Sequence, residues 1–309
     1  MAFNFKEVMN KPERLAPGHR MCAGCGGTIT VRTVLRALKP EDKAVIGNAT
    51  GCLEVSSFMY PYTAWEDSYI HNAFENAGST LSGVETAYYA LKKKGKIKDN
   101  YKFITFGGDG GTYDIGLQSL SGAMERNHDL VYVCYDNGAY MNTGIQRSSA
   151  TPMYADTTTT PAGKVSNGKP QYRKDLASII AEHHVAYVGQ TTFTKDFKDI
   201  HRKSEAAIYA EGPSFLNVMT PCPRGWRYET SEIMEICRLA VETCYWPLFE
   251  YDHGKWILNY EPKNKLPIED FLKPQGRFKH LFKSGNEHLI ESFQEEVDRR
   301  WEELLKKCN

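Results

Sequence analysis

The segment FITFGGDGGTYDIGLQSLSGAMERNHDLVYVCYDNGAYMNTG, residues 103–144, decides the fold that we predict for this chain. Its two short apolar runs, Phe103–Phe106 and Leu130–Tyr135, have the composition and length of buried strands. A glycine-rich turn and a stretch with helical spacing, starting near Thr112, separate them. This order is typical of a parallel crossover unit, in which ligands bind where the carboxyl ends of the strands meet their loops. We therefore predict an α/β protein with a mostly parallel sheet.

Two polar turns follow these strands, and both fall at the predicted ligand edge. Gly107–Gly111 contains Asp109, and Asp136–Gly144 contains Asn137. Mg²⁺ prefers oxygen ligands and usually shares them with phosphate groups. The amide-rich start of the expected helix favours an anion at the same place. A single Gly-Asp-Gly would be read as an ordinary tight turn, but the pair predicts a site for a diphosphate and a hard cation.

Four of the eight cysteines lie in glycine-rich or proline-rich turns. Cys22 and Cys25 form a C-x-x-C pair before a helical stretch, whereas Cys52 and Cys222 each directly follow a strand candidate. In a parallel sheet, Cys52 and Cys222 would lie at the same edge as the two polar turns. Four cysteines at one edge can bind a [4Fe–4S] cluster or zinc, and the pattern does not separate the two.

Other cysteines fit a purely structural interpretation. Cys134 lies inside its strand, and Cys237 and Cys244 fall on an apolar helical stretch, so we expect all three to be small buried residues. His71 and Glu75 would be one helical turn apart in a helix, but we expect a surface or capping role for them. No catalysis is assigned there.

The composition excludes several classes of function. Lysine plus arginine and aspartate plus glutamate each number 38 in 309 residues, so no net charge recruits nucleic acid or an anionic membrane. The first residues lack a signal-peptide apolar core, and no apolar run is long enough to span a bilayer. We expect a soluble, cytoplasmic protein.

The character of the sequence changes near residue 245. We predict one α/β domain over residues 1–244, with a long polar loop at 145–175 that acts as a lid, contacts a partner or is a plain linker. Residues 245–309 are aromatic, charged and rich in proline, and they end in the amphipathic stretch Glu287–Lys307. We expect this C-terminal extension to pack on the domain or on a partner subunit, and find no site chemistry in it.

The motifs carry a family resemblance. Gly108-Asp109-Gly110, followed at this distance by Asn137, resembles the thiamine diphosphate motif of that cofactor's enzymes. Residues 107–116 and 140–152 narrow the match, because they resemble the β subunit of the pyruvate:ferredoxin oxidoreductase family, the 2-oxoacid:ferredoxin oxidoreductases. The resemblance runs over nearly the whole chain. It implies a thiamine diphosphate-binding fold, with helices on both faces of the sheet.

The resemblance also implies a set of site residues. Thiamine diphosphate would contact Thr50, Gly51, Cys52, Gly108, Asp109, Gly110, Gly111, Asn137, Asn142 and Thr143. Mg²⁺ would be held by Asp109, Asn137 and the carbonyl of Ala139. A [4Fe–4S] cluster would be held by Cys22, Cys25, Cys52 and Cys222. Asn142 is the implied catalytic residue and would orient the substrate through its amide.

The implied activity is the oxidative decarboxylation of a 2-oxoacid, foremost pyruvate to acetyl-CoA and CO₂, with single electrons passing to the cluster and then to ferredoxin. In this family a glutamate beside the cofactor pyrimidine and an arginine for the substrate carboxylate come from a partner chain. We therefore expect a heteromer, and an inactive isolated polypeptide.

Three alternatives stay open from the sequence. Gly138 stands where pyruvate-using members of the family usually carry a bulkier acidic residue, which leaves open oxalate, without coenzyme A, or another 2-oxoacid as the substrate. A thiamine-dependent decarboxylase or carboligase without redox function would leave the cysteines unexplained. A zinc-stabilised structural subunit would leave Asp109 and Asn137 unused.

Overall fold

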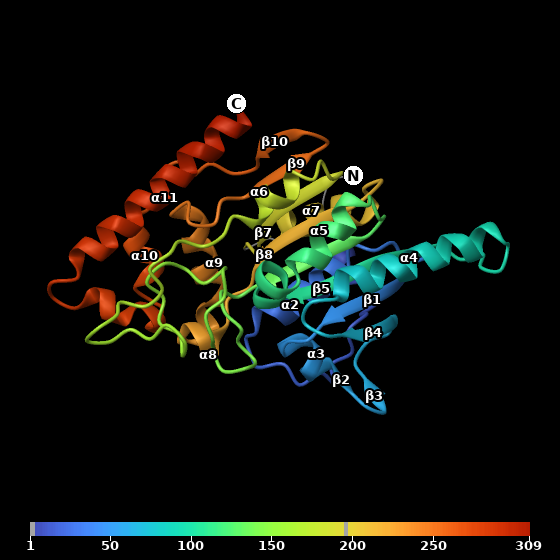
Figure 1. Cartoon of the computed structure of the whole chain (residues 1–309), viewed down its shortest axis with the longest axis horizontal. Coiled ribbons are helices and arrows are strands. Elements are labelled where there is room, and N and C mark those ends of the chain that lie inside the picture. Colours follow the sequence, from blue (N-terminus) through green and yellow to red (C-terminus); the bar gives the residue numbers. More distant parts are fainter. Residues whose placement is uncertain (1–3, 195–196) are drawn as a thin grey trace.

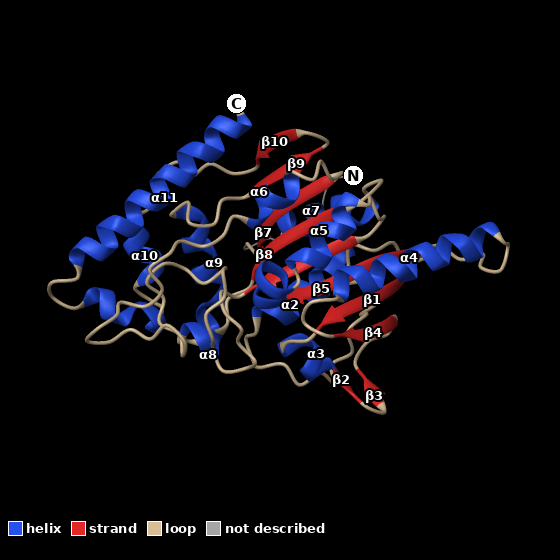
Figure 2. Cartoon of the chain, viewed as in Figure 1, coloured by secondary structure: helices blue, strands red, loops and turns tan. Residues whose placement is uncertain are grey.

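The two strands predicted within residues 103–144 lie side by side near the centre of an eight-stranded sheet (Figures 1 and 2). The computed structural model describes residues 4–194 and 197–309. The order of strands in the sheet is β10-β9-β7-β8-β6-β5-β1-β4, and a separate hairpin pairs β2 with β3. The strands are β1 (Lys43–Ala49), β2 (Phe58–Met59), β3 (Tyr62–Thr63), β4 (Ser68–Asn72), β5 (Tyr101–Gly108), β6 (Val131–Asp136), β7 (Tyr187–Thr192), β8 (Ser214–Met219), β9 (Phe249–Asp252) and β10 (Lys255–Leu258).

Helices cover both faces of this sheet, as the family resemblance implied. On one face α4, α5 and α6 pack through Leu81, Leu120 and Ile180, and on the other α2 and α7 pack through Val31 and Ile200. The α-helices are α1 (Phe5–Met9), α2 (Gly26–Leu35), α3 (Cys52–Ser57), α4 (Ala77–Lys93), α5 (Leu117–Glu125), α6 (Leu176–Ala181), α7 (Lys198–Tyr209), α8 (Pro223–Trp226), α9 (Ile233–Glu242), α10 (Ile268–Leu272) and α11 (Glu287–Cys308). A π-helix, η1 (Gly110–Ile115), and two 3₁₀-helices, η2 (Thr230–Glu232) and η3 (Gly276–Phe282), complete the described elements.

The parallel crossover unit is confirmed, but its helix begins earlier than predicted. β5 and β6 are parallel, with Gly108 opposite Tyr135. The helical segment begins at Gly110, two residues before Thr112, because the chain turns at once into the π-helix η1, which Gly116 closes by donating to the Gly111 carbonyl at 2.7 Å. This wider turn keeps Thr112 buried at the start of the helical segment, and π-turns of this kind are frequent at functional sites.

The segment from His71 to Glu75 is not helical, so the two residues are not one helical turn apart. His71 lies in the edge strand β4 and pairs with Glu54, whose carboxylate is 2.9 Å from its Nδ1. The β-branched and aromatic residues around His71 favour a strand over a helix.

The C-terminal extension packs on the rest of the chain and continues its sheet. β9 pairs antiparallel with β7, and β10 pairs with β9. The amphipathic helix predicted over Glu287–Lys307 is confirmed as α11, which runs along the side of the molecule in Figure 1. Phe271, Phe278 and Phe293 form a core with α9 beyond the end of the sheet. The division at residue 244 stays a prediction, but strands from both sides of it share one sheet.

Among the helices of the described residues, none is long and apolar enough to cross a membrane.

Candidate functional site

Four neighbouring strands end at the same edge and deliver the predicted site. In the order β8-β6-β5-β1, the residues that follow them are Pro221-Cys222, Asn137, Asp109 and Gly51-Cys52. All these strands are parallel to their neighbours, so their carboxyl ends meet at one edge. The parallel sheet thus places the turns of Asp109 and Asn137 and two of the cysteines at one edge.

A small pocket, of about 30 Å³, opens at this edge. Phe74, Tyr135, Tyr140 and Met141 contribute aromatic and apolar walls that we did not predict. The other lining residues are the ones predicted for thiamine diphosphate and Mg²⁺, namely Thr50, Gly51, Cys52, Gly108, Asp109, Gly110, Gly111, Asn137, Ala139, Asn142 and Thr143.

Asp109 is a fully buried carboxylate at the base of the pocket. The Ser148 hydroxyl donates to its Oδ2, and the backbone amide of Asn137 donates to its Oδ1 at 3.3 Å. Burial, and then the nearby charge of Asp136, raise the pKa of Asp109 well above its ordinary value. A divalent cation would offset both effects, because it favours the ionised carboxylate. Ser148 lies in the string at 140–152, yet nothing in its type marked it as a partner of Asp109.

The amide group of Asn137 provides the test of whether a magnesium ion fits. The amide has two terminal positions, one for oxygen and one for nitrogen. One of these positions lies 2.9 Å from Asp109 Oδ1 and 2.9 Å from the Ala139 carbonyl oxygen. With nitrogen in that position, the amide donates to both oxygens, which is the arrangement expected without a metal. With oxygen there, three oxygen ligands converge, and neighbouring ligands of an octahedral Mg²⁺ stand about 2.9 Å apart when the bonds are 2.0–2.1 Å. Oxygen occupies that position in the structure, so the three groups fit Mg²⁺ as they stand, whereas rotation of the amide would satisfy them without a metal.

A buried ion pair supports the turn that carries Asn137. Arg173, from the long loop 145–175, pairs with Asp136, while Asp136 Oδ1 accepts from the Gly138 amide at 3.1 Å. Tyr113 extends the network, because its hydroxyl accepts from Arg173 at 2.7 Å. The loop is therefore partly structural, with Arg173 only 8 % exposed.

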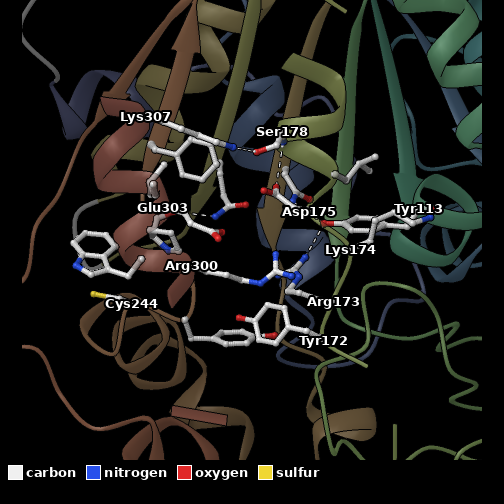
Figure 3. Close-up of a pocket in the computed structure, with 18 residues that line it drawn as sticks. Tyr113, Tyr172, Arg173, Lys174, Asp175, Ser178, Cys244, Arg300, Glu303 and Lys307 are labelled. Carbon is white, nitrogen blue, oxygen red and sulfur yellow. Dashed lines mark hydrogen bonds between the residues drawn. The ribbon is translucent and has the colours of Figure 1, made fainter. Parts of the chain in front are cut away.

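Arg173 also lines a second pocket of about 90 Å³, between α6 and α11, shown in Figure 3. There the guanidinium points toward Tyr113, and Lys307 reaches from α11 to the Ser178 hydroxyl at 2.8 Å. None of the residues predicted for cofactor, magnesium or cluster lines this pocket. The second pocket is connected to the candidate site through Arg173, which lines the pocket and pairs with Asp136.

The four predicted cluster cysteines are unpaired thiols gathered beside the pocket. Burial, and then the neighbouring thiols of Cys222, Cys25 and Cys22, raise the pKa of Cys52 to about 12. Backbone amides point at the sulfur atoms, since Gly225 donates to Cys222 Sγ at 3.4 Å. Amide donors of this kind stabilise thiolate ligands.

One backbone hydrogen bond joins two cysteine segments, and another closes the C-x-x-C turn. Gly26, directly after Cys25, donates to the Pro221 carbonyl at 3.2 Å, and Cys25 donates to the Cys22 carbonyl at 3.2 Å. Within residues 4–194 and 197–309, however, no three histidine, cysteine, aspartate or glutamate side chains stand close enough to hold a single metal ion. The cluster assignment stays a prediction, to which the amide donors and the shared edge lend support.

The mouth of the pocket is formed by the turn after β6. Asn142 and Thr143 are exposed there, and the Tyr140 hydroxyl fastens the turn to the Gly110 carbonyl at 2.8 Å. The described lining residues include no glutamate and no arginine. The lining therefore contains the residues predicted for a cation and a diphosphate, but no glutamate for acid–base chemistry.

Comparison with known proteins defines the class. The family model "Thiamine pyrophosphate enzyme, C-terminal TPP binding domain" matches residues 46–218, which is more than half of the chain and includes Cys52, Asp109 and Asn137. A solved structure of 2-oxoglutarate:ferredoxin oxidoreductase from Magnetococcus marinus has the same fold, with a TM-score of 0.56 at 20% identity over 77% of this chain and 81% of that chain. The chain therefore has the fold of a thiamine pyrophosphate-binding domain.

Closer relatives narrow the class. Pyruvate synthase subunit PorB of Thermotoga maritima is 50% identical, covering 99% of this chain and 96% of the relative. PorB of Methanocaldococcus jannaschii is 47% identical over 95% and 97%, and ketoisovalerate oxidoreductase subunit VorB of Pyrococcus furiosus is 43% identical over 98% and 96%. This chain belongs to the 2-oxoacid:ferredoxin oxidoreductase family, as a β subunit that contains the thiamine pyrophosphate-binding domain.

Proposed function

We propose that this chain is the β subunit of a pyruvate:ferredoxin oxidoreductase, which converts pyruvate, coenzyme A and oxidised ferredoxin to acetyl-CoA, CO₂ and reduced ferredoxin. The observation that carries the proposal is the juxtaposition, at one sheet edge, of the Asp109–Asn137–Ala139 oxygens and the four thiols. Pyruvate is the proposed substrate because the most similar relatives reported above are named pyruvate synthase subunits.

The pocket residues divide into three tasks under this proposal. Asp109, Asn137 and the Ala139 carbonyl would hold Mg²⁺, and the remaining lining residues between Thr50 and Cys52 and between Gly108 and Gly111 would receive the diphosphate. Glycine is needed at position 110 because a Cβ there would stand 2.4 Å from the Tyr140 ring, which packs against this turn. Asn142, exposed at the mouth, would orient the substrate through its amide.

Cys22, Cys25, Cys52 and Cys222 would bind a [4Fe–4S] cluster next to that pocket. When bound, thiamine diphosphate supplies an electron sink for decarboxylation and the cluster supplies a one-electron acceptor. The protein's own contribution is to bury Asp109, to fix the two turns against each other and to direct amides at the sulfurs.

A partner subunit is required by the same reasoning. Because the described lining residues include no glutamate or arginine, the acid–base group for the pyrimidine and the anchor for the substrate carboxylate would come from that subunit. Ferredoxin would be the external acceptor. A cytoplasmic location belongs to the proposal too, since the eight cysteines are all free, as thiols are kept in a reducing compartment.

The experiment is anaerobic purification of the chain with its partner subunits, followed by analysis of iron, acid-labile sulfide, zinc and thiamine diphosphate. The proposal expects about four irons attributable to this chain and thiamine diphosphate in an amount equal to that of the chain. It also expects the visible absorbance to bleach when pyruvate and coenzyme A are added.

Other results would contradict parts of the proposal. Bleaching by oxalate alone, without coenzyme A, would replace pyruvate as the substrate. Zinc with no thiamine diphosphate would overturn the enzyme assignment in favour of a structural subunit. Thiamine diphosphate without iron would favour a decarboxylase or carboligase.

A further inference from the structure

Arg277, on the C-terminal extension, is a buried cation that the proposed function does not yet use. It lies in η3 and is 2 % exposed. Its Nε donates to Gln275 Oε1 at 2.9 Å, but its Nη2 has no hydrogen-bond partner. In the part of the chain that the structure describes, no carboxylate lies within ion-pairing distance of it. Burying an unpaired charge costs several kcal/mol, so the fold keeps this guanidinium at the expense of stability.

The guanidinium packs on the segment that carries Cys222. It lies over the Trp226 ring, 3.8 Å from the centroid, and Trp226 ends the short helix α8 that begins directly after Cys222. Gly276 strengthens this contact by donating its backbone amide to the Arg227 carbonyl at 3.1 Å. Arg277 is therefore held in place on one of the proposed cluster segments.

The same guanidinium faces the turn that carries Asn137. Its Nη1 lies 3.1 Å from the position that a Cβ on Gly138 would take. Gly138 has a φ of +75°, which glycine adopts without strain. The missing side chain thus admits a positive charge between the magnesium turn and the cysteine segment.

The groups around Arg277 are acids. Burial lowers the pKa of Arg277 to about 10, whereas Tyr245, Asp136, Cys222 and Asp109 act in the opposite direction. At neutral pH the group remains protonated, so it is a fixed positive charge. In the protein interior, where the effective dielectric constant is low, such a charge acts on neighbouring centres over several ångströms.

We infer that Arg277 tunes the electron-accepting centre by making the metal–sulfur site at Cys222 easier to reduce. The inference rests on the proposed function. Reduction adds one negative charge to the centre, and a buried cation nearby stabilises that charge without contacting the metal. Charge and hydrogen bonding around a cluster are known levers on its potential. The C-terminal extension, in which the sequence showed no site chemistry, would then contribute directly to electron transfer.

The test measures the midpoint potential of the iron–sulfur signal in the assembled holoenzyme, by titration followed with electron paramagnetic resonance. Arg277→Met removes the charge and keeps much of the packing on Trp226, and Arg277→Lys keeps the charge. Arg277→Gln is a second neutral variant, which carries the test if the methionine variant does not assemble. Arg300→Met is the matched control, because Arg300 stacks on Tyr172 at 4.1 Å but pairs with Glu296.

We expect both neutral variants to shift the potential to more negative values, by at least a tenfold change in the one-electron equilibrium constant, about 59 mV. The lysine and control variants should stay near wild type. An unchanged potential in Arg277→Met or Arg277→Gln, with iron content intact, overturns the inference and leaves the proposed function standing. An equal shift in the lysine variant also overturns it, since packing would then be the cause. A wild-type complex without an iron–sulfur signal overturns both.

Discussion

The indole Nε1 of Trp226 donates a hydrogen bond to the backbone carbonyl of Asn137 at 2.6 Å. This contact joins the segment of Cys222 to the turn of the proposed magnesium ligands, which are 85 positions apart along the chain when counted from Asn137 to Cys222. Trp226 therefore supports the Asn137 turn directly, and loss of its indole donor should weaken that turn.

Trp226→Phe tests this link. The phenyl ring keeps most of the packing but leaves the Asn137 carbonyl without its donor, which costs about 1–3 kcal/mol when the group stays buried. We expect thiamine diphosphate to bind roughly tenfold more weakly, by fluorescence or calorimetric titration of the assembled complex. The control is Trp256→Phe, since Trp256 lies on the edge strand β10, which is not one of the four strands that end at the site. Unchanged cofactor affinity in Trp226→Phe would mean that the turn is held by other contacts alone.

Asp109→Asn and Cys222→Ser should separate the two centres. The asparagine side chain has the shape of Asp109 but no charge, so Mg²⁺-dependent binding of thiamine diphosphate should fall by about 100-fold or more, because even outer-shell changes cost 10–100-fold. Iron content should remain. Cys222→Ser should lower iron content and leave cofactor binding nearly intact. If both variants lost both groups, the assignment of separate ligand sets would be wrong.

Arg173→Met should destabilise the whole turn. It leaves the Asp136 carboxylate buried and unpaired, and breaking a buried ion pair from one side costs about 3–5 kcal/mol. The double variant Arg173→Met with Asp136→Asn should recover part of that loss, because no isolated charge remains. Urea unfolding of Arg173→Met, Asp136→Asn and the double variant, each compared with wild type, gives the coupling energy. Additive losses would show that the two residues act independently.

Gly26→Ala should separate the C-x-x-C turn from the end of β8. A Cβ at Gly26 would stand 2.8 Å from the Thr220 carbonyl carbon, and the crowding atoms belong to backbone that cannot rotate away. We expect a loss of about 1–3 kcal/mol in unfolding free energy. The matched control is Gly83→Ala on the exposed face of α4, where nothing lies within 4 Å and a gain of about 0.5–1 kcal/mol is expected. Equal effects of the two variants would contradict the close approach.

Lys169 should make stability depend on pH in the alkaline range. It is 1 % exposed, donates to the carbonyls of Thr151 at 2.6 Å and Ser149 at 3.1 Å, and its pKa is lowered by burial to about 7. The unfolded chain keeps this proton to about pH 10.4. Between these values the unfolded state binds more protons, so this group makes the unfolding free energy rise with pH, by at most about 1.4 kcal/mol per pH unit.

The measurement compares urea unfolding of wild type and Lys169→Met from pH 7 to 10. The stability difference, wild type minus variant, should increase with pH. For Lys164→Met, at an exposed site in the same loop, the unfolding free energy should change with pH in the same way as that of wild type. A constant difference for Lys169→Met would show that the three carbonyls that accept from Lys169, those of Ser149, Thr151 and Tyr172, keep the folded-state lysine protonated.

The sequence by itself determined the site to the extent that the site is local. Each strand with its following turn, β5 with Asp109 and β6 with Asn137, is specified by a short apolar run and adjacent glycine or polar residues. Parallel pairing then places these turns at one edge, because parallel strands share a direction. For the same reason Cys52 and Cys222 could be expected beside them before the structure was known.

Only the tertiary structure decided what surrounds that edge. β9 and β10 are four residues each, and they become strands because β7 offers a free edge, which no local pattern records. Arg173, Ser148 and Arg277 come from irregular loops or from the extension, and their roles depend on burial beside Asp136, Asp109 and Gly138. Sequence period and turn chemistry encode contacts within an element. A buried charge is explained only by the distant residues that fold around it.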